Sequence, residues 1–309
     1  MIGVVGEALI DLVVAADGTI SAHLGGGPYN TARALGRLGV PASFLGRLST
    51  DDFGRQLADE LASCGVATAV PPTSDPTTLA LARLDESGKA SYQFYLDGTS
   101  APGLTTETLS KFLPPRFDAL HVGTLGLILE PMAAASVAAL RANPNVLRFV
   151  DPNIRPLVIP DRDAYQRRLD TVLANCEVVK VSDDDLGWLI PDTDLVTAAR
   201  AVLAKGPSTV FVTAGPTGTI VVGQGFEQLV PGETVVVADT VGAGDAFSAG
   251  VLTWWWEHAR ASLSGREAAV AAAVFGNRVA ARTVERHGAQ PPKRSEVVSG
   301  DEPGSTAGG

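Results

Sequence analysis

The chain has 309 residues, of which 45% are hydrophobic and 19% charged, so it can bury a sizeable core, which argues against wholesale disorder. The net charge of −10 argues against a nucleic-acid or membrane surface, because such surfaces require a basic patch. A nucleotide remains compatible with this charge, since backbone N–H groups can hold phosphate on an acidic protein.

The two cysteines lack a Cys-x-x-Cys spacing, which is typical of inert thiols in a reducing cytosol, and we expect a cytoplasmic protein. The apolar N-terminus has no basic region and carries Glu7 and Asp11, so we interpret it as a core strand and not as a signal peptide. The apolar stretch around Trp254 is far shorter than the roughly 18 residues of a membrane span.

The first hundred residues predict two helices within a mainly β region. Alternation around Asp17-Gly18 and a second pair of runs around residues 85–88 predict two hairpins, which could form a small sheet outside the main domain. The predicted elements are, in order, strand 2–5, hairpin 11–24, helix 29–38, strand 42–48, helix 53–64 and the hairpin runs 77–84 and 90–96.

From residue 119 onward, apolar strand runs alternate with helical stretches, which predicts a mostly parallel sheet with helices on both faces. The expected fold is a three-layer α-β-α sandwich with a small β lid. We expect one domain over residues 1–290, with lid strands at about 11–24 and 77–100, and an extended or disordered tail over 291–309. The predicted elements are strands 119–122, 146–150, 178–181 and 209–213, helices 131–141, 163–174, 183–189 and 196–204, an antiparallel pair 219–222 and 235–237, and helices 245–256 and 266–286.

The segment DTVGAGDAFSAG, residues 239–250, is the most informative one. It contains the second glycine loop of the chain (Gly242, Ala243 and Gly244), which opens a helix, so small residues and backbone N–H groups favour a bound anion there. Asp245 follows directly and serves either as a helix cap or as a chemical group.

The first glycine loop (Gly25, Gly26 and Gly27) also opens a helix. Its lack of side chains lets a polyol lie against the backbone, and Asn30 offers both a donor and an acceptor to hydroxyl groups. A plain turn is the alternative interpretation of this loop.

These two segments resemble the signatures of the PfkB/ribokinase family of carbohydrate kinases, Gly-Gly-x-x-x-Asn-x-Ala and Asp-Thr-x-Gly-Ala-Gly-Asp. The resemblance covers the chain from Gly3 to about Gln290 and implies a ribokinase-like fold that uses ATP and Mg²⁺ to phosphorylate a sugar. It implies that Asp245 is the catalytic base, that Gly242, Ala243 and Gly244 form the anion hole, and that Asp11, Gly25, Gly26, Gly27 and Asn30 hold the sugar.

The resemblance also implies residues on the nucleotide and cation side. Asp185 stands where the family often has a Glu that handles Mg²⁺, and a capped acidic helix start is the alternative. Asp239 and the Val241 carbonyl resemble a monovalent-cation loop, which leaves a K⁺ requirement open. The candidate nucleotide residues are Lys180, Thr213, Gly215, Gly218 and Asn277, and a plain hairpin turn explains three of them nearly as well.

Asp-Pro-Asn-x-Arg follows a predicted strand, where ligands of open α/β sheets collect, so Asn153 and Arg155 are candidates to face sugar or phosphate. A simple Asp-Pro turn is the alternative. Phe94 in the second hairpin could close over the sugar or pack within the lid, and the lid could mediate a homodimer.

The pattern Gly-Gly-x-Pro-x-Asn-x-Ala with Asp-Pro-Asn-x-Arg resembles fructokinases more than ribokinases, so fructose is the expected substrate. Tyr29, bulkier than the common Ala, could reshape the pocket, which leaves 2-keto-3-deoxygluconate, ribose and nucleosides open. A nicotinamide oxidoreductase lacks its Gly-x-Gly-x-x-Gly and a P-loop enzyme its Walker A motif. A non-catalytic sugar or nucleotide sensor would usually lose the base, whereas Asp245 is present.

Overall fold

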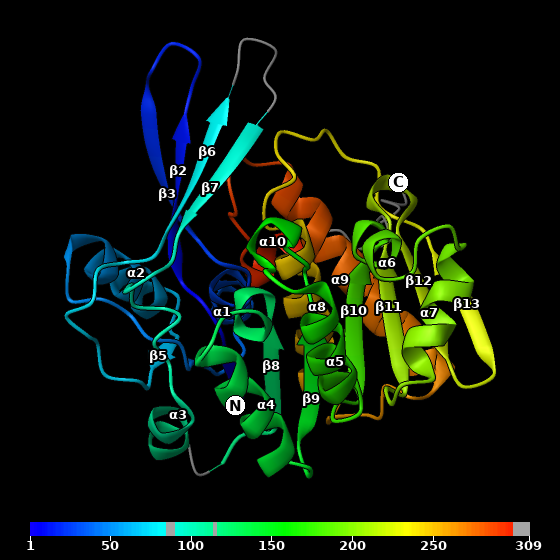
Figure 1. Ribbon diagram of the computed structural model, residues 1–309. Helices are drawn as coiled ribbons and strands as arrows, with labels where there is room; N and C mark the ends of the chain where they lie inside the picture. Colours follow the sequence, from blue (N-terminus) through cyan, green and yellow to red (C-terminus); the bar gives the residue numbers. More distant parts are fainter. Residues whose placement is uncertain (85–89, 114–115, 299–309) are drawn as a thin grey trace.

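The computed structural model describes residues 1–84, 90–113 and 116–298, which form a nine-stranded sheet and a separate four-stranded sheet (Figure 1). The predicted three-layer fold is confirmed, since the large sheet is parallel except for β12, which runs against its neighbours. The strand order is β13 (Phe226–Val230), β12 (Thr219–Gly223), β11 (Thr209–Thr213), β10 (Val178–Ser182), β9 (Leu147–Asp151), β8 (Ala119–Gly123), β1 (Ile2–Val5), β4 (Ala42–Phe44) and β5 (Ala67–Thr68).

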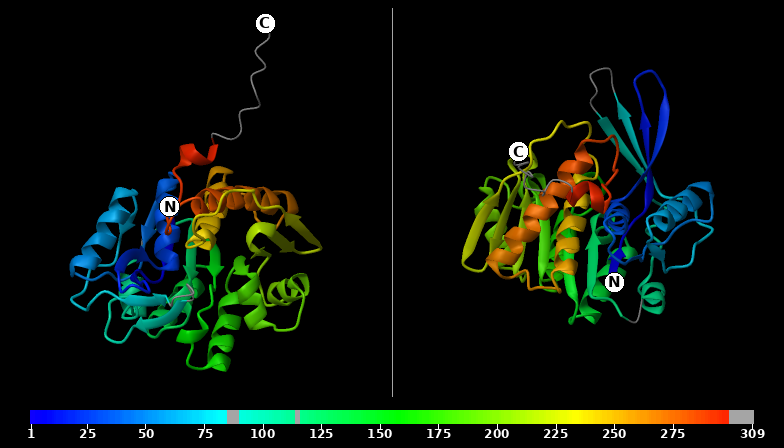
Figure 2. Two further views of the ribbon diagram at one scale, coloured as in Figure 1. Left: turned by 90° about the horizontal axis from the view of Figure 1, so that it is seen from above. Right: turned by 180° about the vertical axis from the view of Figure 1, so that it is seen from behind.

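Helices cover both faces of this sheet, and each interface has its own apolar core. The face seen from behind in Figure 2 packs under α1 (Gly27–Arg37), α2 (Asp52–Ser63), α8 (Ala243–Glu257), α9 (Arg266–Val284) and α10 (Arg294–Val298). The opposite face packs under α3 (Thr106–Phe112), α4 (Met132–Ala142), α5 (Arg162–Leu173), α6 (Asp183–Leu189) and α7 (Leu195–Leu203). In the described part of the chain, none of these helices combines the length and apolar character of a bilayer span.

The central strands are nearly continuous apolar runs, as expected for a parallel sheet that is covered on both faces. Lys180 in β10 and His121 in β8 break this pattern, although both are almost fully buried. A cation in such a position requires a partner, because an unpaired buried charge is costly. Lys180 therefore marks a place where the fold holds a charge for a purpose.

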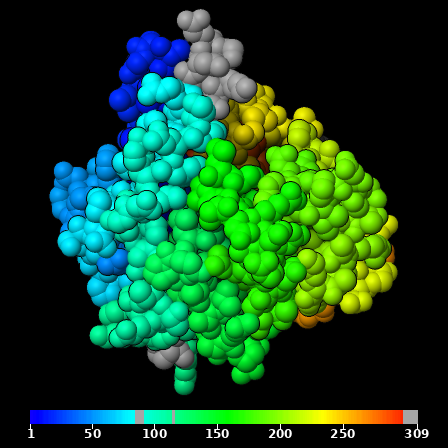
Figure 3. Space-filling view, in the orientation of Figure 1, coloured from blue at the N-terminus to red at the C-terminus, as the bar shows by residue number. Residues whose placement is uncertain are grey.

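The four-stranded sheet is a lid that projects from the main body (Figures 1 and 3). Its first hairpin turns at Asp17-Gly18 as expected, with Gly18 at φ 85°. The turn expected at residues 85–88 lies outside the described residues. The lid strands are β3 (Ile20–Gly25), β2 (Leu9–Val14), β6 (Leu79–Leu84) and β7 (Ala90–Tyr95).

Two expectations about the C-terminal half are wrong. Residues 235–237 do not pair with β12, because β13 follows it after a tight turn in which Gly225 takes φ 74°, and the side chain of Val236 is 86% exposed. Residues 294–298 form α10 instead of an extended tail, since Val297 is buried in the core. Residues 299–309 lie outside the described part of the chain.

Candidate active site

The candidate site lies where the N-termini of α1 and α8 meet the carboxyl ends of the central strands. Asp245 in the first turn of α8 is 8% exposed, and its Oδ2 accepts a hydrogen bond of 2.9 Å from Asn30 Nδ2. The hydroxyl of Thr31 donates to the Asp245 carbonyl at 3.4 Å, so α1 holds both the side chain and the backbone of this residue. Asn30 and Asp245 are 215 positions apart in the sequence.

The environment of Asp245 weakens its acidity. Burial raises the pKa of Asp245 to about 7, and the charge of Asp151 adds to this effect. The Asn30 hydrogen bond and the charges of Lys180 and Arg155 act in the opposite direction. A carboxylate with a pKa near neutrality is suited to take a proton from a hydroxyl group.

The second glycine loop leaves a set of free amides beside this carboxylate. Gly242 is the N-cap of α8 with φ 78°, and Ala243 uses its N–H for the carbonyl of Thr240 at 3.2 Å. Within the described residues, the N–H groups of Gly242, Gly244 and Asp245 have no hydrogen-bond partner. The free donors are therefore the amides on either side of Ala243 and the amide of Asp245 itself, at a helix end that favours anions.

Lys180 lies directly beneath this loop. A Cβ atom at Gly244 would come within 2.7 Å of its Nζ, so only glycine leaves room for the ammonium group. Lys180 pairs with the buried Asp151 at 3.2 Å, and Ser248 donates to the same carboxylate. Burial alone lowers the pKa of Lys180, but the charges of Asp151, Asp185 and Asp245 outweigh burial and raise it, so the lysine is ionised.

The first glycine loop faces a group of polar side chains. A Cβ atom at Gly27 would collide with the hydroxyl of Thr124 and come within 3.2 Å of Asp245 Oδ1 and of Asn153 Nδ2. A Cβ atom at Gly25 would collide with the carboxylate of Asp11. The loop is thus bare because four polar side chains converge on it, which is the arrangement that a polyol needs.

Asn153 and Arg155 lie beside this group. Asn153 adopts φ 39° and donates to the Thr124 hydroxyl at 3.2 Å. The guanidinium of Arg155 donates to the carbonyls of Asn153 and Ile154, and its charge lowers the pKa of Asp11 and Asp245. Burial is the larger effect on Asp11 and raises its pKa to about 6.

The predicted nucleotide residues hold the turns next to α8. Thr213 donates to the Val181 carbonyl at 3.4 Å, and Gly215 opens a short 3₁₀ turn with φ 50°. Gly218 packs against the backbone after β13, where Asn277 also binds the carbonyls of Val230 and Pro231. The second polar atom of the Asn277 amide accepts from Thr219 at 2.6 Å, so the side chain acts within the protein.

The predicted cation residues also bond within the chain. Asp185 completes a capping box with Ser182 and accepts from the Ile154 amide at 2.7 Å, which corresponds to the capped helix start given as the alternative. Asp239 accepts from the amides of Val241 and Gly288. Among the described residues, no group of three His, Cys, Asp or Glu side chains could hold a metal ion.

Two aromatic residues lie apart from this site. Tyr29 was expected to reshape the sugar pocket, but it is fully buried, donates to the Leu57 carbonyl and packs edge-on against Phe44. Phe94 lies on the lid strand β7, partly buried against the core, and stays a prediction as a sugar contact.

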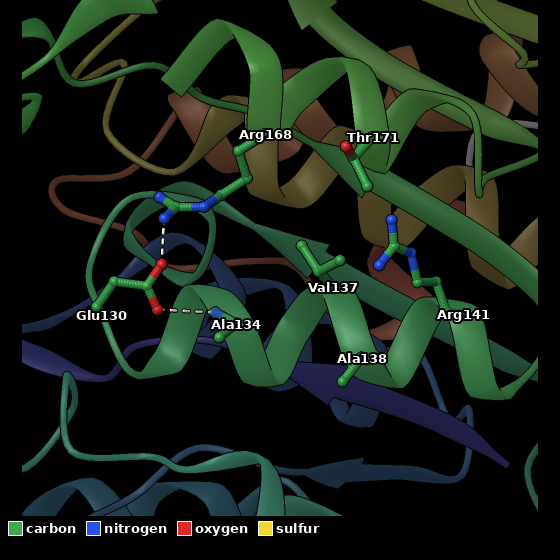
Figure 4. A pocket seen from close by; sticks show the side chains of 7 residues that line it. All are labelled: Glu130, Ala134, Val137, Ala138, Arg141, Arg168 and Thr171. Carbon is green, nitrogen blue, oxygen red and sulfur yellow. Dashed lines mark hydrogen bonds and ion pairs between the residues drawn. The ribbon is translucent and has the colours of Figure 1, made fainter. Parts of the chain in front are cut away.

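A groove of about 380 Å³ between α4 and α5 contains none of these residues (Figure 4). Its carboxylate, Glu130, is already bound by Arg168 and by the amide of Ala134. The groove is lined by Glu130, Ala134, Val137, Ala138, Arg141, Arg168 and Thr171.

Three side chains at the site were not predicted as functional from the sequence: Glu7, Thr124 and Asp151. Glu7 follows β1 and accepts from the amide of Gly27 at 3.0 Å, although it carried a signal as a charged residue in an apolar run. Thr124 had no signal, because a threonine after a strand is common. Asp151 belongs to the recognised Asp-Pro-Asn segment, but its partner Lys180 is set only by the order of β9 and β10.

Comparisons with known proteins place the chain in a family. Residues 1–296 match the model of the pfkB family carbohydrate kinases. The fructokinase of Rhizobium leguminosarum bv. trifolii is 36% identical over 80% of this chain and 77% of its own length. Fructokinase-1 of Zea mays is 31% identical over 95% of each chain.

A solved structure supports the same assignment. Fructokinase from Vibrio cholerae O395, in its fructose, ADP and calcium ion bound form, has a TM-score of 0.84 and 26% identity over 96% of this chain and 97% of its own. With a buried carboxylate beside free amides at a helix N-terminus, the chain belongs to the pfkB family of carbohydrate kinases and is an ATP-dependent sugar kinase.

Proposed function

We propose that the protein is a fructokinase, which transfers the terminal phosphoryl group of ATP to a hydroxyl of fructose. The observation that carries this proposal is the Asp245 carboxylate, held by Asn30 and flanked by the free amides of Gly242 and Gly244. Fructose is favoured over other sugars because the similar curated proteins are named fructokinases and a similar structure contains fructose and ADP.

In the proposed mechanism, Asp245 takes the proton of the sugar hydroxyl as its oxygen attacks the terminal phosphorus. The bond from phosphorus to the bridging oxygen of ADP breaks, and ADP leaves. The free amides and the ammonium group of Lys180 stabilise the negative charge of the transferring group, because they are already oriented and need no reorganisation.

The sugar would lie against the first glycine loop. Asp11, Asn153 and Arg155 are the proposed partners of its other hydroxyl groups, and Thr124 joins them. Thr213 and Gly215 are proposed to line the nucleotide side, since they end β11 next to the α8 N-terminus.

The cations fit this scheme in different ways. Mg²⁺ would be bound mainly by phosphate oxygens and water, the usual style for this ion, with Asp185 acting through water. Asp239 and the Val241 carbonyl are the proposed K⁺ ligands, and turnover in K⁺-containing against K⁺-free buffer tests this role. The proposed homodimer through the lid is tested by sedimentation.

A coupled assay of ADP formation tests the substrate. We expect the highest kcat/KM with fructose among fructose, ribose, 2-keto-3-deoxygluconate and adenosine. At least tenfold better turnover of one of the other three, roughly the discrimination of one good polar contact, would reject fructose as the substrate. No ADP formation with any of them would reject the kinase assignment of this site in favour of a sensor.

The acidity of Asp245 predicts a pH dependence. The base acts only when deprotonated, so kcat/KM for the sugar should fall as pH drops below about 7, by about tenfold for each pH unit. A pH–rate profile measures this, and the residual activity of an Asp245→Asn variant should lack the same limb. A midpoint near about 4, the ordinary value for Asp, would contradict the proposed environment.

A further inference from the structure

Glu7 is a buried acid that the proposed mechanism does not use. It follows β1, and its side chain is 1% exposed. Its Oε1 accepts the hydrogen bond from Gly27, whereas Oε2 is buried and has no partner among the described residues. An ionised carboxylate normally gathers several donors or a cation, and Glu7 has a single amide.

The backbone around Glu7 is fitted to the first glycine loop. Gly26 adopts φ 106°, and a Cβ atom there would come within 2.7 Å of the Glu7 carbonyl oxygen. Gly27 is the first residue of α1, and its open side faces Thr124 and Asp245. Glu7 therefore contacts the loop from behind, on the side opposite to the proposed sugar.

The bond from Gly27 to Glu7 also lies upstream of the catalytic contact. Gly27 and Asn30 belong to the same first turn of α1, and Asn30 holds the carboxylate of Asp245. A shift of the Gly27 amide would thus move both the loop and the group that orients the base. A positional error of about 1 Å at such a site can cost about a hundredfold in rate.

We propose that Glu7 is a positioning residue that holds the first glycine loop through Gly27 and does so as a neutral carboxylic acid. The proposal deepens the proposed function and rests on it, since the loop is assigned there to the sugar. An ionised Glu7 would place a second buried negative charge close to Asp245, with one hydrogen bond to offset its desolvation.

The charged groups around Glu7 support this protonation state. Burial raises the pKa of Glu7 to about 8, and the negative charge of Asp245 on α8 acts in the same direction. The amides of Glu7 itself and of Gly27, and the positive charge of Arg155 after β9, lower it by less. Glu7 is therefore protonated at neutral pH and ionises in mildly alkaline solution.

Two variants test the proposal with the full-length protein. Glu7→Gln keeps an acceptor for Gly27 and has no charge, so kcat/KM for fructose at about pH 7 should stay within about threefold of wild type. Glu7→Met fills the same space without an acceptor, so KM for fructose should rise about tenfold while KM for ATP stays unchanged. The wild type should lose activity above about pH 8, and Glu7→Gln should retain it.

Thermal unfolding supplies a readout that does not depend on activity. The folded pKa of Glu7 is raised, so its contribution to stability is complete below about pH 4.5 and is lost as pH rises towards about 8. The Tm of Glu7→Gln minus that of wild type should therefore increase between about pH 5 and pH 9. This measurement remains decisive if fructose is not the substrate.

The outcomes that overturn the proposal are distinct. A Glu7→Gln protein that unfolds, or that loses activity at neutral pH as Glu7→Met does, would show that the negative charge is required. A Tm difference that does not change with pH would show that Glu7 is ionised throughout.

Discussion

Replacement of Asp245 by Asn is expected to lower kcat by about 10²- to 10⁴-fold, the range supplied by a positioned general base. The dissociation constants for fructose and ATP should change little, because the Asn side chain can still accept the hydrogen bond from Asn30 and the free amides of the second glycine loop remain. Stopped assays of ADP formation measure kcat, and calorimetric titration measures binding.

Asp59→Asn is the matched control for this variant, since Asp59 is an exposed aspartate on α2 outside the proposed site. Its turnover should equal that of wild type. Near-normal turnover of Asp245→Asn would show that another group takes the proton, and the base would then have to be sought among Asp11 and the other acids around the first glycine loop.

Much of the fold followed from local patterns in the sequence. Apolar runs and glycine stops predicted most strands and helices, because a parallel sheet with two covered faces requires such runs. The error at residues 235–237 has a local cause. A β-branched run favours a strand, but the Gly225 turn had already supplied the partner of β12.

The chemistry of the site was less predictable, because it depends on contacts between distant segments. The resemblance to a family pointed to Asn30 and Asp245, but their hydrogen bond joins residues 215 positions apart. The pair of Lys180 and Asp151 arises only when β9 and β10 become neighbours. Tyr29 shows the reverse error, since a residue next to a signature can point into the core.

The second glycine loop provides the other large expected effect. Gly242→Ala should lower kcat by about 10²- to 10³-fold, the cost of losing one preorganised donor to a developing anion. The new Cβ atom would lie 2.6 Å from Ala289 Cβ, and the left-handed φ of 78° would be strained for alanine. Both effects should move the free amides of Gly242 and Gly244 out of place.

Gly65→Ala separates the loss of the anion site from backbone strain. Gly65 has φ 74°, and a Cβ atom added there would meet nothing within 4 Å, so alanine experiences strain of the same kind at the end of α2, away from the site. This control should lose about 1–2 kcal/mol of stability and keep its turnover. Parallel measurements of kcat and Tm on both variants decide the matter: if both lose turnover alike, global strain is the cause, whereas a loss confined to Gly242→Ala identifies the loop amides as the groups that receive the phosphoryl charge.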